Sequence, residues 1–227
     1  LSAIKSFYKY LTIRTKQLEE NPVADLEYPK LRKSLPKYLT FEESSRLLQS
    51  VSGVNEKRDY AILMLFLNCG IRRSELVGLN LSDVYEDRIR VVGKGNKERH
   101  VPLTPYLKRA ILKYRRIKEQ YFADKIIPYK HLLLSRTGRP MTKEAMEHIF
   151  KQAAAQTDVR TNIRCSPHTA RHYFAQTHLR NGLDVYSVSR LLGHENINIT
   201  KRYLQSMQDS SIVEMAVKTS PLRNIRI

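Results

Sequence analysis

The chain has 227 residues, of which 41% are hydrophobic, enough for a sizeable core, so the composition excludes a disordered tail. Forty Lys and Arg residues against 22 Asp and Glu residues give a formal net charge of +18. Because the cations are spread through amphipathic segments, this balance indicates a folded domain that binds a polyanion. DNA or RNA fits better than a membrane surface.

The longest apolar run, AILMLFLNCG, is shorter than the roughly 20 residues needed to cross a bilayer, so we expect no membrane partner. No signal peptide is visible at the first residues. The two cysteines, Cys69 and Cys165, give no disulfide framework and predict free thiols in a reducing cytoplasm. We therefore expect a cytoplasmic protein.

The first 38 residues predict a helix and then a linker. Residues 2–12 place apolar side chains at helical spacing, which predicts that the chain begins inside a helix. Because the first residue is Leu and not Met, we interpret the chain as a fragment whose earlier part was removed. Residues 22–38 contain three prolines and several cations and predict an extended basic linker. We favour phosphate contact over a solvated spacer for its cations Arg32, Lys33 and Lys37.

The next segments predict a helical domain. Thr40 and Glu43 form a capping box that opens a helix. Residues 58–69 are apolar nearly all round and predict a buried central helix. The following GIRRSEL segment places Arg72 three residues before Glu75, so the carboxylate could orient the guanidinium and leave donors free for a phosphate. A purely structural Arg–Glu pair is the alternative.

Residues 84–103 change to a period of two on both sides of the turn GKGN and predict a β-hairpin. Lys94 lies at its glycine-flanked tip, where a lysine can enter a DNA groove and give a proton to a leaving oxygen. An ordinary exposed turn lysine is the alternative. We also take Lys97 and Arg99 of the hairpin as candidate DNA contacts.

Three further elements follow the hairpin. Residues 105–121 predict a basic amphipathic helix, and residues 132–135 predict a short buried strand. A helix is then predicted from Thr142 through Ala155. Lys143 near its start is a candidate major-groove contact, although a solvated face fits equally well. Together these elements predict a mainly α fold with a small antiparallel β-sheet (α+β).

Residues 166–204 hold the candidate catalytic groups. Pro167 opens a helix on which His168 and Arg171, three positions apart, project from one face. Arginine suits a phosphate because its planar fork binds two oxygens and stays charged. Histidine adds a donor that also moves protons near neutral pH.

The last predicted elements bring a tyrosine to these cations. Asp184 caps the next helix and Gly193 ends it, which leaves His194 at a helix end. Tyr203 follows nine positions later, on a short helix expected to be capped near Asn198 or Thr200. A tyrosine hydroxyl is a weak nucleophile at its free pKa, and its attack on a phosphodiester builds charge that fixed cations stabilise. The prediction requires these cations to surround Tyr203.

A metal site is not expected. His168 and His172 are four positions apart, which resembles a zinc pair, but HTARH lacks the Glu of HExxH. No further cluster of Cys, His or Asp completes a tetrahedral site. We therefore expect neither a metal nor a cofactor.

In their order and spacing, the segments NPV, LPKYLTFEE, CGIRRSEL, VVGKGNKERHVPL, SPHTARHYFA and LLGHENINITKRY resemble the tyrosine recombinase (lambda-integrase-type) family. Within it, they are most similar to the Xer recombinases and to integrases of mobile elements. The resemblance implies a catalytic domain of this family preceded by the end of a helical core-binding domain. The implied division is a core-binding helix at 1–24, a linker at 25–38, the catalytic domain at 39–205 and a C-terminal segment at 206–227.

The resemblance also implies roles for six residues. It makes Tyr203 the nucleophile, Arg72 and Arg171 the two catalytic arginines, Lys94 the general acid, His168 the acid/base histidine and His194 the second histidine. The implied activity is site-specific recombination of double-stranded DNA through a 3′-phosphotyrosine, with no metal and no cofactor. The implied assembly is a homo-oligomer on DNA, a tetramer that exchanges residues 206–227 between protomers.

Two other functions remain open at this point. A type IB topoisomerase shares the resembling catalytic set but relaxes DNA, and a DNA-binding regulator of recombinase ancestry would have lost the tyrosine or an arginine. Integration, transposition and chromosome-dimer resolution are all compatible with a recombinase. The recombinase interpretation requires Arg72 and Arg171 to face one common cleft.

Overall fold

The computed structural model describes residues 1–29 and 38–204, and the chain divides into two units between residues 34 and 35. In the first unit, α1 (Ser2–Lys9) continues into a π-helical turn (Tyr10–Arg14). This agrees with the helix predicted over the first residues. None of the side chains described in this unit is buried.

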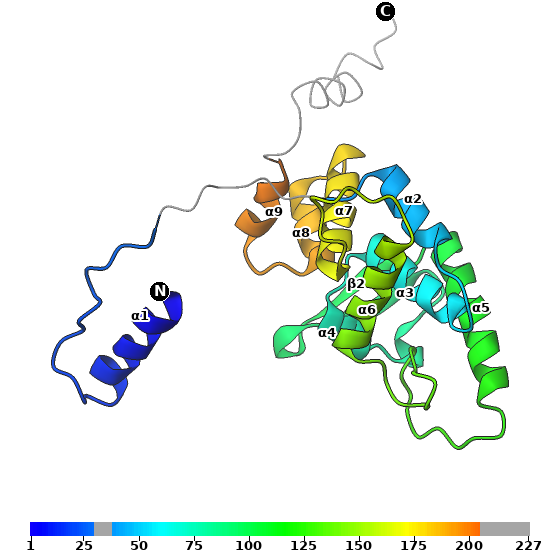
Figure 1. Ribbon diagram of the computed structural model, residues 1–227, viewed down its shortest axis with the longest axis horizontal. Coiled ribbons are helices and arrows are strands. Elements are labelled where there is room, and N and C mark those ends of the chain that lie inside the picture. Colours follow the sequence, from blue (N-terminus) through cyan, green and yellow to red (C-terminus); the bar gives the residue numbers. More distant parts are fainter. Residues whose placement is uncertain (30–37, 205–227) are drawn as a thin grey trace, which may run out of the picture. The chain divides into compact units, whose positions relative to one another are not determined.

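The second unit is mainly helical with one two-stranded antiparallel sheet, as predicted (Figure 1). Its strands are β1 (Arg88–Val92) and β2 (Glu98–Pro102). Short 3-10 turns lie at Leu81–Asp83 and Lys94–Asn96. Its helices are α2 (Phe41–Gln49), α3 (Glu56–Cys69), α4 (Arg73–Val77), α5 (Pro105–Tyr121), α6 (Lys143–Ala155), α7 (Pro167–Arg180), α8 (Val185–Leu192) and α9 (Ile197–Leu204).

Helix α3 is the centre of this unit. It contacts both α5 and α7, and every residue from Ala61 to Leu67 is buried, as expected for a helix that is apolar on all sides. The helix ends at Gly70, which has a φ of +56°. A Cβ there would lie 2.5 Å from the ring of Phe174, so both the backbone conformation and the space require glycine.

The predicted hairpin is present, with Ile89 paired to Val101 and Val91 paired to Arg99. Ile89, Val91 and Val101 are almost fully buried, so this face of the sheet covers the core around α3. The other face is more exposed. The alternation that predicted the hairpin therefore also fixes which of its side chains point inward.

Helices α7, α8 and α9 pack on one another beside α3 and enclose a second, smaller core (Figure 1). As predicted, Asp184 caps α8, with its side chain accepting from Ser187 N, and Gly193 ends it with a φ of +64°. The buried residues of this core are Phe174, Ala175, Leu179, Val188, Leu192 and Tyr203. The candidate nucleophile is thus also a packing residue.

Two local predictions are wrong. Residues 132–135 form no regular strand; within this segment Leu134 makes one isolated bridge, to Pro140, while the three leucines are buried. Burial of a short apolar run does not require a partner strand. Helix α9 begins at Ile197, before the expected capping residues, because the side chain of Asn196 accepts a hydrogen bond from the N–H of Asn198.

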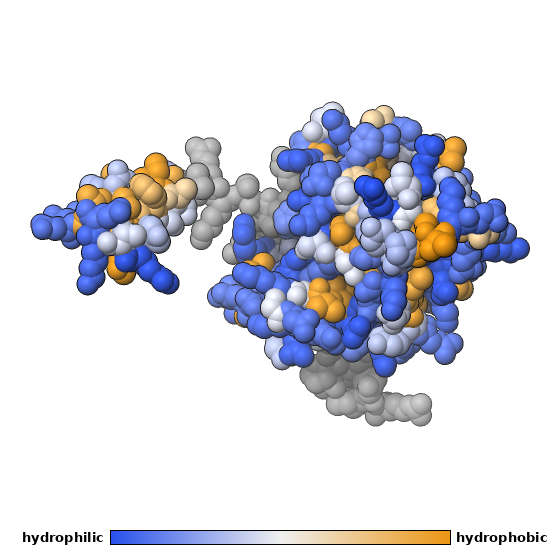
Figure 2. Space-filling model, turned by 90° about the horizontal axis from the view of Figure 1, so that it is seen from below, coloured by the Kyte–Doolittle hydropathy of each residue, from blue (hydrophilic) through white to orange (hydrophobic). Residues whose placement is uncertain are grey.

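Several further predictions concern residues that the structure describes. Cys69 and Cys165 are free thiols, Cys69 buried and Cys165 partly exposed. No helix in the described ranges has the length and apolar character to span a membrane. Hydrophilic residues cover most of the face seen in Figure 2, with apolar side chains scattered among them. The candidate contacts Arg32, Lys33 and Lys37 and the segment 206–227 lie outside the described residues.

Candidate active site

The C-terminal end of α8 receives both candidate catalytic arginines. Arg171, on α7, donates from Nη2 to the carbonyl of Leu192 at 2.6 Å and from Nη1 to the carbonyl of Gly70. Arg72 donates from Nη2 to the carbonyl of Gly193 at 2.9 Å. The carbonyls at a helix C-terminus carry the negative end of its dipole and attract cations. The two arginines, 99 positions apart (171 − 72), therefore meet at adjacent carbonyls.

The two arginines differ in exposure. Arg171 is 6% exposed, and burial, together with nearby Arg72, lowers its pKa to about 9, so it stays charged at neutral pH. The side chain of Arg72 is 41% exposed. One guanidinium is therefore a fixed buried charge and the other presents part of its fork to solvent.

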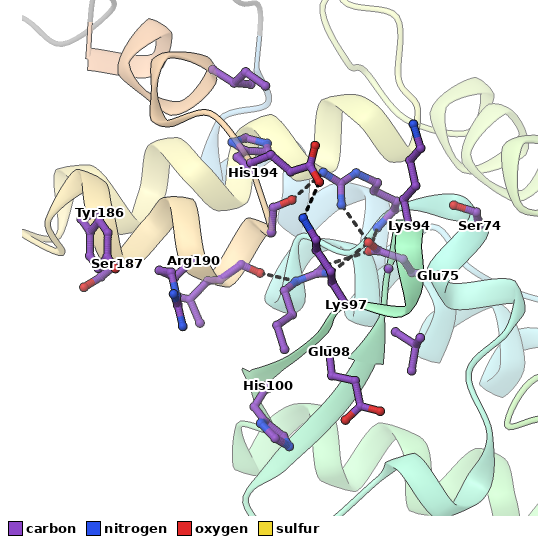
Figure 3. Close-up of a pocket in the computed structure, with 18 of the residues that line it drawn as sticks. Ser74, Glu75, Lys94, Lys97, Glu98, His100, Tyr186, Ser187, Arg190 and His194 are labelled. Carbon is purple, nitrogen blue, oxygen red and sulfur yellow. Dashed lines mark hydrogen bonds and ion pairs between the residues drawn. The ribbon is translucent and has the colours of Figure 1, made fainter.

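Glu75 orients Arg72, as the sequence suggested. Its carboxylate accepts from Arg72 N at 2.7 Å and from Arg72 Nη1 at 2.8 Å, closing a capping box at the start of α4. It also accepts from Arg99 Nη1 and Nη2, at 2.9 and 2.7 Å (Figure 3). Burial acts to raise the pKa of Glu75, but the hydrogen bonds and charge of Arg99 and Arg72 outweigh it and bring the pKa to about 2.

Arg99 supports this arrangement from the sheet. Its side chain is 11% exposed, and its Nε donates to the carbonyl of Leu191 at 2.7 Å. All three guanidinium nitrogens thus bind protein groups, although Arg99 also lines the cleft described below, and its contact with DNA stays a prediction. The register places this side chain toward the core, because Arg99 pairs with the inward-facing Val91 and shares its face with Val101. The alternation in the sequence already carried this signal.

His194 follows directly on the carbonyl that Arg72 contacts. Its Nδ1 lies 2.7 Å from Oγ1 of Thr200, which is fully buried. Burial, followed by the charges of Arg171 and Arg72, lowers the pKa of His194 to about 4. At neutral pH it is therefore an uncharged imidazole, able to donate from one ring nitrogen while the other faces the threonine.

Tyr203 is 4% exposed and lies against α7. Nδ1 of His172 is 2.8 Å from the Tyr203 hydroxyl, and Nε2 of Gln176 donates to the Tyr203 carbonyl at 2.8 Å. Burial raises the pKa of Tyr203, while the charges of Arg171 and Arg202 act in the opposite direction. The phenol is therefore protonated at neutral pH.

The two histidines of HTARH form an edge-on pair. Their ring centroids are 4.1 Å apart, and the ring of His172 is 5.2 Å from that of Tyr203. His168, in the first turn of α7, is exposed, and burial followed by Arg171 and Arg73 lowers its pKa. The sequence singled out His172 only as half of a zinc pair. In the described ranges, no group of three or more His, Cys, Asp or Glu side chains could hold a metal.

The hairpin tip is the exposed part of the site. Lys94 is exposed and is followed by two residues of positive φ, Gly95 at +72° and Asn96 at +57°. Lys97 forms a 2.8 Å ion pair with Glu195, and both side chains are more than 70% exposed (Figure 3). The charge of Lys94 also acts on Glu195, so the tip lies beside the segment that joins α8 to α9.

A cleft of about 1490 Å³ is lined by residues of the hairpin and of α8. Arg72, Lys94 and His194 line it together with Tyr186 and Arg190 of α8, and Figure 3 shows Lys94 across from the latter two. Its volume exceeds the roughly 300–1000 Å³ of small-molecule sites and suits a larger substrate. The described lining includes Arg72 but not Arg171, His168 or Tyr203. Lys143 is exposed at the start of α6 and is not part of the lining either.

Comparison with known proteins identifies the family. The model of the phage integrase family matches residues 37–209, and the chain belongs to that family, the tyrosine recombinases. It is 37% identical over 223 residues to the tyrosine recombinase XerC of Caldanaerobacter subterraneus subsp. tengcongensis, covering 98% of this chain and 62% of that relative. The chain thus spans less than two thirds of that relative's length.

Two solved structures show the same fold. The crystal structure of XerA recombinase matches with a TM-score of 0.70 at 24% identity, covering 97% of this chain and 83% of that one. A lambda integrase dimer bound to a COC′ core site matches with a TM-score of 0.70 at 17% identity, covering 92% of this chain and 59% of that one. At these identities the likeness concerns the fold.

Proposed function

We propose that this chain is the catalytic part of a site-specific DNA recombinase that cleaves and rejoins strands through a 3′-phosphotyrosine. Residues 39–205 are its catalytic domain, 25–38 its linker and 1–24 the end of a core-binding domain. Family membership and the +18 net charge support this proposal. The observation that carries it is the meeting of Arg72 and Arg171 at the adjacent carbonyls of Gly193 and Leu192, next to His194.

The proposed chemistry follows from the charges of these groups. The Tyr203 oxygen attacks the scissile phosphorus, and the bond from phosphorus to the 5′-oxygen breaks. Arg72, Arg171 and His194 donate to the non-bridging oxygens, where negative charge grows. Lys94 protonates the departing 5′-oxygen, and His168 receives the tyrosine proton. Rejoining reverses the step with a 5′-hydroxyl of the partner strand, so the bond energy is kept in the phosphotyrosine.

The substrate we propose is double-stranded DNA bound by a homo-oligomer. The lambda integrase dimer on its core site has the same fold, and the cleft is large enough for a macromolecular strand. We propose a tetramer that exchanges residues 206–227 between protomers. The exposed cations Lys97 and Lys143, with Arg32, Lys33 and Lys37 of the linker, are the proposed phosphate contacts.

A covalent-capture experiment on randomised DNA tests the function and selects the target sequence at the same time. The protein is incubated, in chelator, with nicked duplexes whose sequence is randomised, and denatured; the DNA that stays attached is then sequenced. We expect a covalent product with a shared sequence for the wild type. The variant Tyr203→Phe should give none, because it lacks the hydroxyl.

The control for this experiment is Tyr173→Phe, a change at a half-buried tyrosine of α7, which should form the adduct at the wild-type rate. An adduct that persists in Tyr203→Phe would contradict the assignment of the nucleophile. Relaxation of a supercoiled plasmid without any exchange between two sites would favour a topoisomerase instead.

A further inference from the structure

The histidine next to the candidate nucleophile is not one of the six residues assigned from the sequence. His172 lies one turn after His168 on α7, and its Nδ1 is 2.8 Å from the Tyr203 hydroxyl. One turn further along the same helix, Gln176 holds the Tyr203 carbonyl at 2.8 Å. Positions 172 and 176 share a helix face, so α7 contacts this tyrosine at its hydroxyl and at its main chain.

The protonation states of the two groups make this hydrogen bond directional. Burial raises the pKa of Tyr203 above its usual range, so the phenol keeps its proton and can donate it. Burial, followed by the charges of His168 and Arg171, lowers the pKa of His172 to about 4. Its ring is therefore neutral, and one nitrogen carries a free lone pair. The phenol donates to Nδ1, and the remaining ring proton sits on Nε2.

We propose that His172 is a positioning residue, which accepts a hydrogen bond from the Tyr203 hydroxyl and aims it beside Arg171. This inference rests on the proposed function, because it assigns a task in the same reaction. His172 neighbours Arg171 in sequence, so the helix that fixes the buried guanidinium also fixes the direction of the phenol. Reactions of this kind depend steeply on the placement of the attacking atom.

His172 acts by placement and not by removing the proton. A base with a pKa of about 4 is a poor acceptor for the proton of a phenol whose pKa lies above its usual value of about 10. The proton released during attack therefore goes to another acceptor, the role proposed above for the more exposed His168. A residue that only needs to accept a hydrogen bond can be replaced by another acceptor of similar shape.

The chain contains a matched control on the same helix. His178 is also half-buried on α7, packs edge-on against Phe174 at 4.3 Å, and has a pKa lowered by burial. His178 thus contacts the ring of Phe174 and not that of Tyr203. Substitutions of His178 therefore report the effect of changing a half-buried histidine of α7 without changing the hydrogen bond to the phenol.

The first test compares His172→Asn and His172→Phe. The Asn amide oxygen can take the place of Nδ1, whereas Phe keeps the ring and removes the acceptor. On DNA recovered by covalent capture, we expect His172→Phe to slow single-turnover cleavage about 10- to 100-fold with DNA affinity unchanged. His172→Asn should stay within about 3-fold of wild type, as should His178→Asn and His178→Phe.

Two outcomes would overturn the proposal. Wild-type cleavage by His172→Phe would show that the contact has no effect. Equal loss in His172→Asn and His172→Phe, with intact folding, would show that a proton acceptor is needed rather than a hydrogen-bond acceptor. If the wild type itself formed no adduct, the proposed function would fail first, and this rate comparison would not apply.

A second test needs no DNA. In protein labelled with ¹⁵N-histidine, the seven histidines are assigned, and the Nδ1 resonance of each is compared between wild type and Tyr203→Phe. We expect Nδ1 of His172 to be unprotonated in wild type at pH 7 and to shift when the hydroxyl is removed, while His178 stays unchanged. An Nδ1 that carries the proton, or that does not respond, would contradict the proposed hydrogen bond whatever the DNA result.

Discussion

The C-terminal end of α8 and the tip of the β1–β2 hairpin each place a cation on the cleft, Arg72 at the first and Lys94 at the second, but they hold these side chains in opposite ways. At the end of α8, Arg72 and Arg171 each bind a backbone carbonyl, and Glu75 fixes Arg72 further. At the tip, Lys94 is exposed between glycines. The arginine side chains are therefore oriented by protein groups before a substrate binds, whereas the Lys94 side chain is exposed to solvent.

The difference matches two chemical tasks. Groups that stabilise charge on a phosphate work best when they are already oriented, because no reorganisation is then needed during the reaction. A proton donor must reach the leaving oxygen at the right moment, which an exposed lysine on a glycine-flanked turn can do. The comparison therefore predicts that mutations at the hairpin tip change the rate of cleavage but not the stability of the fold, whereas mutations at the end of α8 also change its stability.

The largest expected effect is on chemistry alone. Lys94→Ala should slow cleavage of captured DNA by about 10²- to 10⁴-fold, because the leaving 5′-oxygen loses its acid. Its unfolding free energy should stay at the wild-type value, since the side chain is exposed. Replacing the leaving oxygen by sulfur, which needs no protonation, should restore the rate of the variant. Failure of sulfur to restore it would remove Lys94 from this role.

The next effect is on the stability of the region that holds the arginines. Glu75→Gln should destabilise the domain by about 3–5 kcal/mol, because Arg72 and Arg99 lose a buried counter-charge. Urea unfolding measures this, with Glu98→Gln as the control, since the side chain of Glu98 is 47% exposed on the hairpin. We expect the control to change little. Equal, small effects of both substitutions would contradict the contrast between the two regions.

A smaller effect concerns pH. His172 and His194 have pKa values of about 4 in the folded protein, below the usual 6.5, so the unfolded chain binds their protons first as the pH falls. Their contribution is complete above pH 6.5 and is lost as the pH falls through 4, on the order of 2–4 kcal/mol in total after allowance for partial exposure. Glu75, with its pKa of about 2, contributes above pH 4.5 and loses this below it.

Urea unfolding measured between pH 7 and pH 4 gives the slope of the unfolding free energy against pH and so checks this prediction. In His172→Asn the slope should fall by about one proton, because one of the two histidines no longer titrates. A slope that is the same in the variant and the wild type would show that His172 is not held neutral by the fold.

The smallest effect belongs to the exposed pair of Lys97 and Glu195. Lys97→Ala should leave the unfolding transition unchanged, because an ion pair this exposed is screened by water and salt. If Lys97 contacts a phosphate, the slope of log affinity against log salt should fall by about one. A marked loss of stability would place this pair with the rigid region instead.

Residue spacing predicted much of this fold. It failed where contacts between segments that are distant in the sequence determine the local structure. The capping box at Thr40, the central helix and the left-handed glycine at Gly193 are local features, and all are present. Residues 132–135 are buried without pairing as a strand, which depends on what surrounds them. Arg99 faces inward because its strand alternates, a signal that was available in the sequence.

The candidate site shows the same limit. Motif spacing singled out Arg72, Arg171 and His194, but not the carbonyls that hold the two arginines, since those come from the ends of two helices folded together. His172 stood in the sequence as half of a possible metal pair. Its contact with the Tyr203 hydroxyl depends on how α9 packs on α7, which no local pattern encodes.

The most direct test of the central claim is a double-mutant cycle between Arg72→Ala and Arg171→Ala, measured as the rate of covalent adduct formation with folding checked in each variant. If both arginines act on one phosphate, each single substitution should cost about 10²- to 10³-fold, and the double variant little more than the worse single one. Losses that multiply in the double variant would show two independent sites and contradict the account.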